Sequence, residues 1–99
     1  MNLRILASAF NDLADGRDFY ERQGAGLGDY FLNSLFSDID SLALYAGIHR
    51  KFLGFHRLLA KRFPCGIYHQ SDGTEVMVYR VLDLRREPRK IRTALKSAT

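Results

Sequence analysis

Apolar residues recur at helical spacing in the first half of the chain. From Leu27 to Tyr45 they lie four residues apart, which predicts an amphipathic helix that stops near Gly47. A weaker stripe predicts a helix from about Ser8 to Gln23, with Ser8 as its N-cap and its acidic side chains facing solvent. The glycines between the two helices allow a tight reversal, so we expect an antiparallel hairpin. These glycines are Gly24, Gly26 and Gly28.

The pattern changes to strands between Phe55 and Arg86. Strands are expected over 55–60, 65–70 and 75–84, with Phe63-Pro64 ending the first and Ser71-Asp72-Gly73-Thr74 forming a hairpin turn. In the last strand, alternation places Val76, Val78, Leu82 and Leu84 on one face and Met77, Tyr79 and Val81 on the other. Both faces are apolar, which is typical of a central strand. Arg80 interrupts the first face and requires a partner or a route to solvent.

The flanking segments complete an α+β pattern. Residues 3–6 are predicted to form an edge strand, residues 48–54 a basic connection, and residues 88–96 a short helix that begins at Pro88. The expected architecture is one domain, 1–99. It has an N-terminal strand, an antiparallel helical hairpin packed on an antiparallel sheet containing a three-stranded meander, and a short C-terminal helix.

Composition narrows the class of protein. The 99 residues are 46% hydrophobic and include seven phenylalanines and five tyrosines, enough for one ordinary core. No apolar run approaches the roughly 18 residues that span a bilayer, and the N-terminus is a poor signal peptide. The single cysteine, Cys65, cannot form an internal disulfide. We therefore expect a cytoplasmic protein that does not enter a membrane.

Charge is distributed unevenly along the chain. Residues 1–49 carry three basic and seven acidic side chains, a net charge of −4. Residues 50–99 carry twelve basic and four acidic side chains, a net charge of +8. A concentrated positive half favours a polyanionic or acidic partner, although a solvated basic face without a partner has the same composition.

Strand direction predicts where these basic residues meet. Two reversals return the meander to its first direction, so the strands 55–60 and 75–84 end side by side. The basic side chains at these two ends should therefore cluster, and they are suited to phosphate or carboxylate recognition. Some of the arginines can instead pair with Asp83 or Glu87. The expected target-binding residues are Lys61, Arg62, Arg85 and Arg86, with Arg50 and Lys51 on the rim.

Other chemistry finds little support in the sequence. The three histidines, His49, His56 and His69, are scattered along the chain, and no Cys or His lies at metal-ligand spacing from Cys65. Neither a metal nor a cofactor is therefore expected. Cys65 is predicted to be a small apolar strand residue rather than a catalytic thiol. His69 is predicted to be a half-exposed strand residue, and its alternative role is that of an acid or base near neutral pH.

The order of several motifs resembles the RelE/ParE superfamily of bacterial type II toxins, also labelled plasmid-stabilisation proteins. The resemblance covers nearly the whole chain. Its pieces are Asp18-Phe19-Tyr20-Glu21, Gly26-Leu27-Gly28 with Phe31, Asp38-Ile39, Lys61-Arg62-Phe63-Pro64, Gly66-Ile67-Tyr68, Val81-Leu82-Asp83 and Arg85-Arg86-Glu87-Pro88.

The resemblance implies a growth-inhibiting toxin that a cognate antitoxin neutralises. ParE-like members inhibit DNA gyrase, whereas RelE-like members cleave mRNA on the ribosome with basic sheet residues and a His or Tyr near the C-terminus. The segment from Arg92 to Thr99 contains neither residue, which favours the ParE-like activity. The alternatives are a RelE-like endoribonuclease and an inactive or repurposed nucleic-acid-binding domain. In the nuclease, the catalytic residues would be Arg57, Lys61, Arg62 and Arg85, with His69 as proton carrier.

Overall fold

The computed structural model describes residues 2–46 and 50–97 and contains a five-stranded sheet with helices on both faces. Strand β1 (Asn2–Ile5) leads into helices α1 (Ala7–Glu21), α2 (Leu27–Asp40) and α3 (Leu42–Tyr45). Strands β2 (Lys51–Phe52), β3 (Phe55–Leu59), β4 (Cys65–Ser71) and β5 (Glu75–Asp83) follow, and α4 (Pro88–Ser97) comes last. The predicted α+β order is confirmed. Gly47, the expected stop of the helix predicted over 27–45, lies outside the described residues, and so does His49.

The strands are arranged in the order β1-β5-β4-β3-β2. The meander of β3, β4 and β5 is antiparallel, as predicted. The sheet as a whole is mixed, because β1 pairs with β5 in parallel, from Asn2 opposite Glu75 to Ile5 opposite Val78. The segment expected to be a connection also contributes β2, which pairs with the start of β3.

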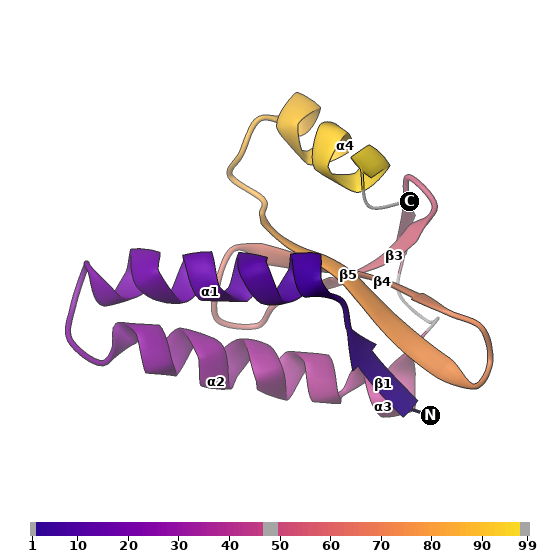
Figure 1. Ribbon diagram of the computed structural model, residues 1–99, viewed down its shortest axis with the longest axis horizontal. Helices are drawn as coiled ribbons and strands as arrows, with labels where there is room; N and C mark the ends of the chain where they lie inside the picture. The colour runs from indigo at the N-terminus through magenta and orange to yellow at the C-terminus, as the bar shows by residue number, and fades with distance from the viewer. Residues whose placement is uncertain (1, 47–49, 98–99) are drawn as a thin grey trace.

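The sheet separates two cores. The α1–α2 hairpin covers one face, where Leu13, Phe31 and Leu35 pack on Ile67 and Val78. Figure 1 shows α4 lying apart from this hairpin. On the opposite face, α4 packs through two buried side chains against β3, β4 and β5. The second core contains Phe55, Tyr68, Leu82, Ile91 and Leu95.

A β-bulge changes the faces of β5. Tyr68 lies opposite Arg80 and His69 lies opposite Val78, so Tyr79 is an extra residue in β5. Beyond the bulge, Val81 joins Val78 in the hairpin core while Leu82 joins the α4 core. Tyr79 lies on the face opposite Val78, as predicted, but the predicted faces were wrong from Val81 onward, because strict alternation does not allow for an inserted residue.

The start of α1 also differs from the prediction. The helix begins at Ala7, and Leu6 occupies the N-cap position without a side-chain cap. The prediction of Ser8 as the N-cap was wrong, since its hydroxyl donates to the carbonyl of Tyr79 at 2.6 Å and ties α1 to the bulge.

Close packing at Gly16 brings α1 and α2 together, since a Cβ there would lie 2.5 Å from the Phe31 ring.

Candidate functional site, a basic groove between the sheet and α4

A groove of about 280 Å³ lies between the sheet and α4. The strands supply its floor because Tyr68 and Arg57 face α4, while Pro88 and Ile91 form the helical wall. We call it the sheet–α4 groove. Its lining residues are Phe52, Arg57, Tyr68, Leu84, Arg86, Pro88, Ile91 and Arg92.

The polar lining of the sheet–α4 groove is strongly basic. Three arginines contribute to it, and its lining residues, all within the described part of the chain, include no carboxylate and no imidazole. The Arg57 guanidinium lies 5.4 Å from the centre of the Phe52 ring, in cation–π range. Guanidinium groups recognise carboxylates and phosphates through paired N–H donors, so this lining is suited to an anion.

Tyr68 gives the groove one buried polar atom. Its side chain has no exposed surface, and its hydroxyl makes no hydrogen bond within the described part of the chain. Gly66 leaves space for this ring, because a Cβ there would lie 3.1 Å from Tyr68 Cε2 and 3.2 Å from Arg57 Cδ. A buried hydroxyl without a partner is unfavourable, so a ligand that accepts a hydrogen bond from it would be stabilised in the groove.

The two arginines that follow β5 have different surroundings. Arg85 binds Asp83 with Nη2–Oδ2 at 2.7 Å and Nε–Oδ1 at 3.0 Å. The hydrogen bond from Arg85 lowers the pKa of the Asp83 carboxyl, and the pKa of Arg85 is raised in turn. Arg86 has an exposed side chain that lines the sheet–α4 groove. Of the two, Arg86 is therefore better placed to meet a ligand.

The remaining predicted basic residues lie around the sheet. Lys61 and Arg62 are exposed in the β3–β4 loop, at the same end of the sheet as Arg85 and Arg86, because Leu59 pairs with Gly66 and Cys65 with Asp83. Neither lines the groove. The Lys61 amide donates to the buried Asp38 carboxylate at 3.1 Å, which anchors the loop.

The predicted rim residues, Arg50 and Lys51, lie at the other edge. Both are exposed, Arg50 accepts a backbone bond from Arg57, and Lys51 belongs to the edge strand β2. They are close in sequence to the Phe52 wall but are not among the groove's lining residues.

His69 does not occupy the position expected for a proton carrier. Its side chain has no exposed surface, so the prediction of a half-exposed strand residue was wrong. It shares a face of β4 with Ile67, on the hairpin side, and its Nδ1 lies 3.1 Å from the Ile67 carbonyl. It lies in β4 between His56 of β3 and Val78 of β5, and this pairing has no local signal in the sequence. A substrate in the sheet–α4 groove would lie on the opposite face.

Cys65 is buried, as expected for a small strand residue. Burial raises the pKa of its thiol to about 11, so the reactive thiolate is scarce at neutral pH. Over residues 2–46 and 50–97, no cluster of three or more His, Cys, Asp or Glu side chains is arranged to hold a metal ion.

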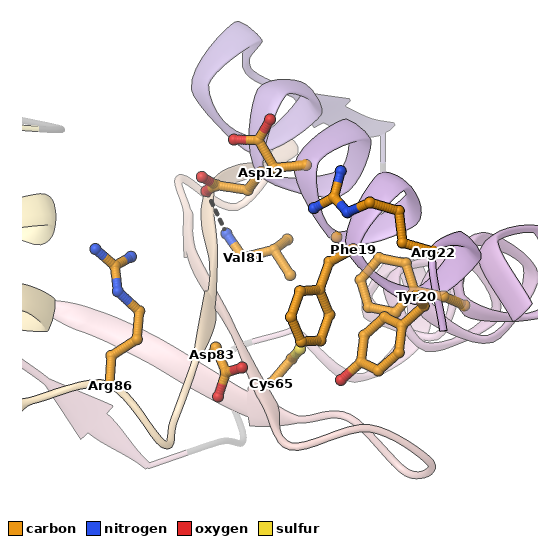
Figure 2. Close-up of a pocket in the computed structure, with 11 residues that line it drawn as sticks. Asp12, Phe19, Tyr20, Arg22, Cys65, Val81, Asp83 and Arg86 are labelled. Atoms are coloured by element: carbon orange, nitrogen blue, oxygen red, sulfur yellow. Dashed lines mark hydrogen bonds between the residues drawn. The ribbon is translucent and has the colours of Figure 1, made fainter. Parts of the chain in front are cut away.

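A second cavity of about 330 Å³ lies beneath α1, beside the ends of β4 and β5. Figure 2 shows Phe19 and Tyr20 above Cys65, with Asp12 bonded to the Val81 amide and Arg86 on the far side. Burial raises the pKa of the Tyr20 phenol. We call this the hairpin cavity. Its lining residues are Asp12, Asp15, Gly16, Phe19, Tyr20, Arg22, Phe31, Cys65, Val81, Asp83 and Arg86.

Sequence reasoning missed functional candidates at both sites. Tyr68 and Arg92 line the sheet–α4 groove, and Asp12 lines the hairpin cavity. The resemblance contained Tyr68 as a motif residue, but its direction depends on strand register. Arg92 is recognisable only once α4 is placed on the sheet.

Comparison with known structures supports the fold. The chain is similar to a chain of the structure described as "Chromosomal ParDE TA system from P. aeruginosa", with a TM-score of 0.73 and 20% sequence identity. The match covers 86% of this chain and 97% of that one. It confirms the α+β, ParE-like fold that the motifs predicted. No protein-family model and no curated protein sequence matches the chain. No helix in the described part of the chain is long and apolar enough to span a membrane.

Proposed function

We propose that this chain is the toxin of a type II toxin–antitoxin module and acts in the cytoplasm as a ParE-like inhibitor of DNA gyrase. The fold it shares with a chain of the ParDE system supports this class of protein. One further observation favours inhibition by binding over RNA cleavage. The sheet–α4 groove contains three arginines but no carboxylate or imidazole among its described lining residues to move a proton.

The hairpin cavity is suited to the antitoxin. Its lining combines the aromatic and apolar side chains of Phe19, Tyr20, Phe31 and Val81 with charged side chains. Interfaces are commonly anchored by one apolar side chain in such a pocket. We expect an antitoxin segment to place an apolar residue there, so that Phe19→Ala weakens neutralisation more than toxicity.

Expression without an antitoxin tests the proposal. Growth arrest is expected in the wild type, with loss of plasmid supercoiling and intact mRNA. The double variant Arg57→Ala/Arg86→Ala should require about tenfold more protein for the same arrest, because two anion-binding groups are removed. Arg62→Ala is the matched control, an exposed arginine outside the groove. Unchanged growth in the wild type contradicts the toxin assignment.

A RelE-like endoribonuclease is the second candidate, and the Tyr68 hydroxyl favours it. This hydroxyl is buried in the arginine-lined groove and is the one lining group able to exchange a proton near a bound phosphate. Cleavage mapping in a translating extract separates the two activities. Codon-positioned cuts that Tyr68→Phe abolishes would establish the nuclease and exclude the binding mode.

A further inference from the structure

The turn between β2 and β3 holds a leucine in an unfavourable conformation. Phe52 pairs with Phe55, so Leu53 and Gly54 form a two-residue hairpin loop. Their φ angles are 52° and 85°, both in the left-handed region. Such loops favour Asn-Gly, because a side chain like that of leucine crowds the following carbonyl in this conformation. Leu53 is also 48% exposed, so core packing does not account for it.

This turn directly follows one wall residue of the sheet–α4 groove. Phe52, directly before Leu53, lines the groove beneath the Arg57 guanidinium, and its ring centre lies 6.2 Å from that of Tyr68. The Gln70 side-chain amide donates to the Gly54 carbonyl at 3.2 Å and tethers the turn to β4. Lys51 adds an exposed cation beside the tip. Leu53 is not itself a lining residue of the groove, but it directly follows Phe52, which is, so the exposed leucine lies next to a basic site.

We propose that the sheet–α4 groove and the Leu53 tip together bind an acidic, apolar segment of a protein partner. Its carboxylates would meet Arg57, Arg86 and Arg92, and an apolar side chain would cover Leu53. This inference rests on the proposed function only in taking the partner to be a protein.

The lining of the groove favours a protein segment over nucleic acid. Four of its eight lining residues are apolar, namely Phe52, Leu84, Pro88 and Ile91. A nucleic-acid backbone would use the arginines but would gain little from an aliphatic tip, since bases stack on aromatic or guanidinium planes. Strain is retained in proteins mainly where function compensates for it, and contact with an apolar partner supplies that compensation.

Fluorescence polarisation at low salt tests the proposal without a toxicity assay. The probes are a short peptide of alternating glutamate and leucine, the same peptide with serine replacing leucine, and a single-stranded DNA of equal charge. The leucine peptide should bind about tenfold more tightly than either other probe, because it alone supplies apolar contact. Leu53→Asn should abolish this advantage while raising the melting temperature by about 4 °C, since Asn tolerates the left-handed region.

Leu44→Asn is the matched control. Leu44 is 81% exposed on the helix α3, outside both the groove and the turn, so this variant should bind like the wild type. Three results would each overturn the inference: tightest binding of the DNA, equal affinity of the Leu53→Asn variant, or no binding of any probe. A wild type that binds the leucine peptide but does not arrest growth would contradict the proposed function alone.

Discussion

Asp12 connects α1 to the most irregular point of the sheet. Its carboxylate accepts bonds from Arg80 Nε at 2.7 Å, from Arg80 Nη2 at 2.9 Å and from the Val81 amide at 2.9 Å. The hydrogen bonds that Arg80 donates to Asp12 raise the pKa of Arg80. These bonds give Arg80, which interrupts the apolar pattern of β5, its charged partner. The expectation that the acidic residues of α1 face solvent was therefore wrong for Asp12. The side chain of Asp12 is only 12% exposed.

Removing the Asp12 carboxylate should therefore be costly. Asp12→Ala leaves the guanidinium of Arg80, whose side chain is only 21% exposed, and the Val81 amide without this acceptor. We expect the free energy of unfolding to fall by about 2–4 kcal/mol, as for other partly buried charge pairs broken from one side. Urea unfolding measures it. Asp15→Ala, an exposed acid on the same helix, should change stability by less than about 0.5 kcal/mol. Equal losses in the two variants would show that the Asp12 bonds contribute little.

At the scale of elements, the sequence predicted features set by neighbouring residues better than features set by contacts between elements. The α2 stripe and the turn at Asp72-Gly73 were correct, because helical period and turn chemistry are properties of neighbouring residues. The single helix predicted over 27–45 was wrong at Ser41, where the chain divides into α2 and α3. The bulge at Tyr79 and the Asp12–Arg80 pair were missed, since their partners lie on other elements, up to 69 residues away. The same limit applies to the site. Its basic residues were visible in the sequence, but whether Arg85 or Arg86 is engaged depends on Asp83.

The β4–β5 hairpin should weaken in acid through Asp72. Its Oδ1 accepts bonds from the Thr74 amide at 3.0 Å, the Thr74 hydroxyl at 2.9 Å and the Glu75 amide at 2.8 Å. The bond from the Thr74 amide is the main cause that lowers the pKa of this carboxyl below its ordinary value of 3.8. A carboxyl with a lowered folded-state pKa stabilises the fold above its unfolded value, and this contribution is lost as the pH falls through the folded one.

Asp72→Asn tests this, because the amide oxygen can still accept but does not titrate. The decline in stability as the pH falls below 3.8 should be shallower in this variant than in the wild type. Thermal unfolding over a pH series measures the decline. Asp40→Asn, at an exposed carboxylate that ends α2, is the control. Parallel pH profiles for the wild type and Asp72→Asn would contradict the assignment.

Helix α4 should open more easily than the hairpin. It buries only Ile91 and Leu95, whereas α2 buries six residues along its length. Local stability follows buried contact, so amides of α4 should exchange with deuterium faster than those of α2 under native conditions. Leu95→Ala should abolish the remaining protection of α4 and leave that of α2 intact. Equal protection of the two helices in the wild type would show that α4 is as firmly held as the hairpin.

At the scale of the whole molecule, the fold turns the uneven charge of the sequence into two layers. The first half, with a net charge of −4, supplies β1 and the hairpin α1–α2, while the second half, with +8, supplies most of the sheet and α4. Arg89 and Lys90 extend the positive charge along α4 beyond the sheet–α4 groove. An acidic partner would therefore be attracted to the α4 side and repelled from the hairpin side.

This polarity should appear in association rates. Arg89→Glu/Lys90→Glu should slow binding of the acidic peptide about tenfold at low salt, because steering depends on charges outside the contact. Stopped-flow fluorescence measures the rate. The difference should nearly vanish near 1 M salt, where the Debye length is only about 3 Å. Asp15→Lys/Asp18→Lys adds the opposite charge change on the exposed side of α1 and should alter the rate much less. If both double variants changed the rate equally, net charge rather than the two-layer arrangement would govern encounter, and the α4 side would have no special role in guiding a partner.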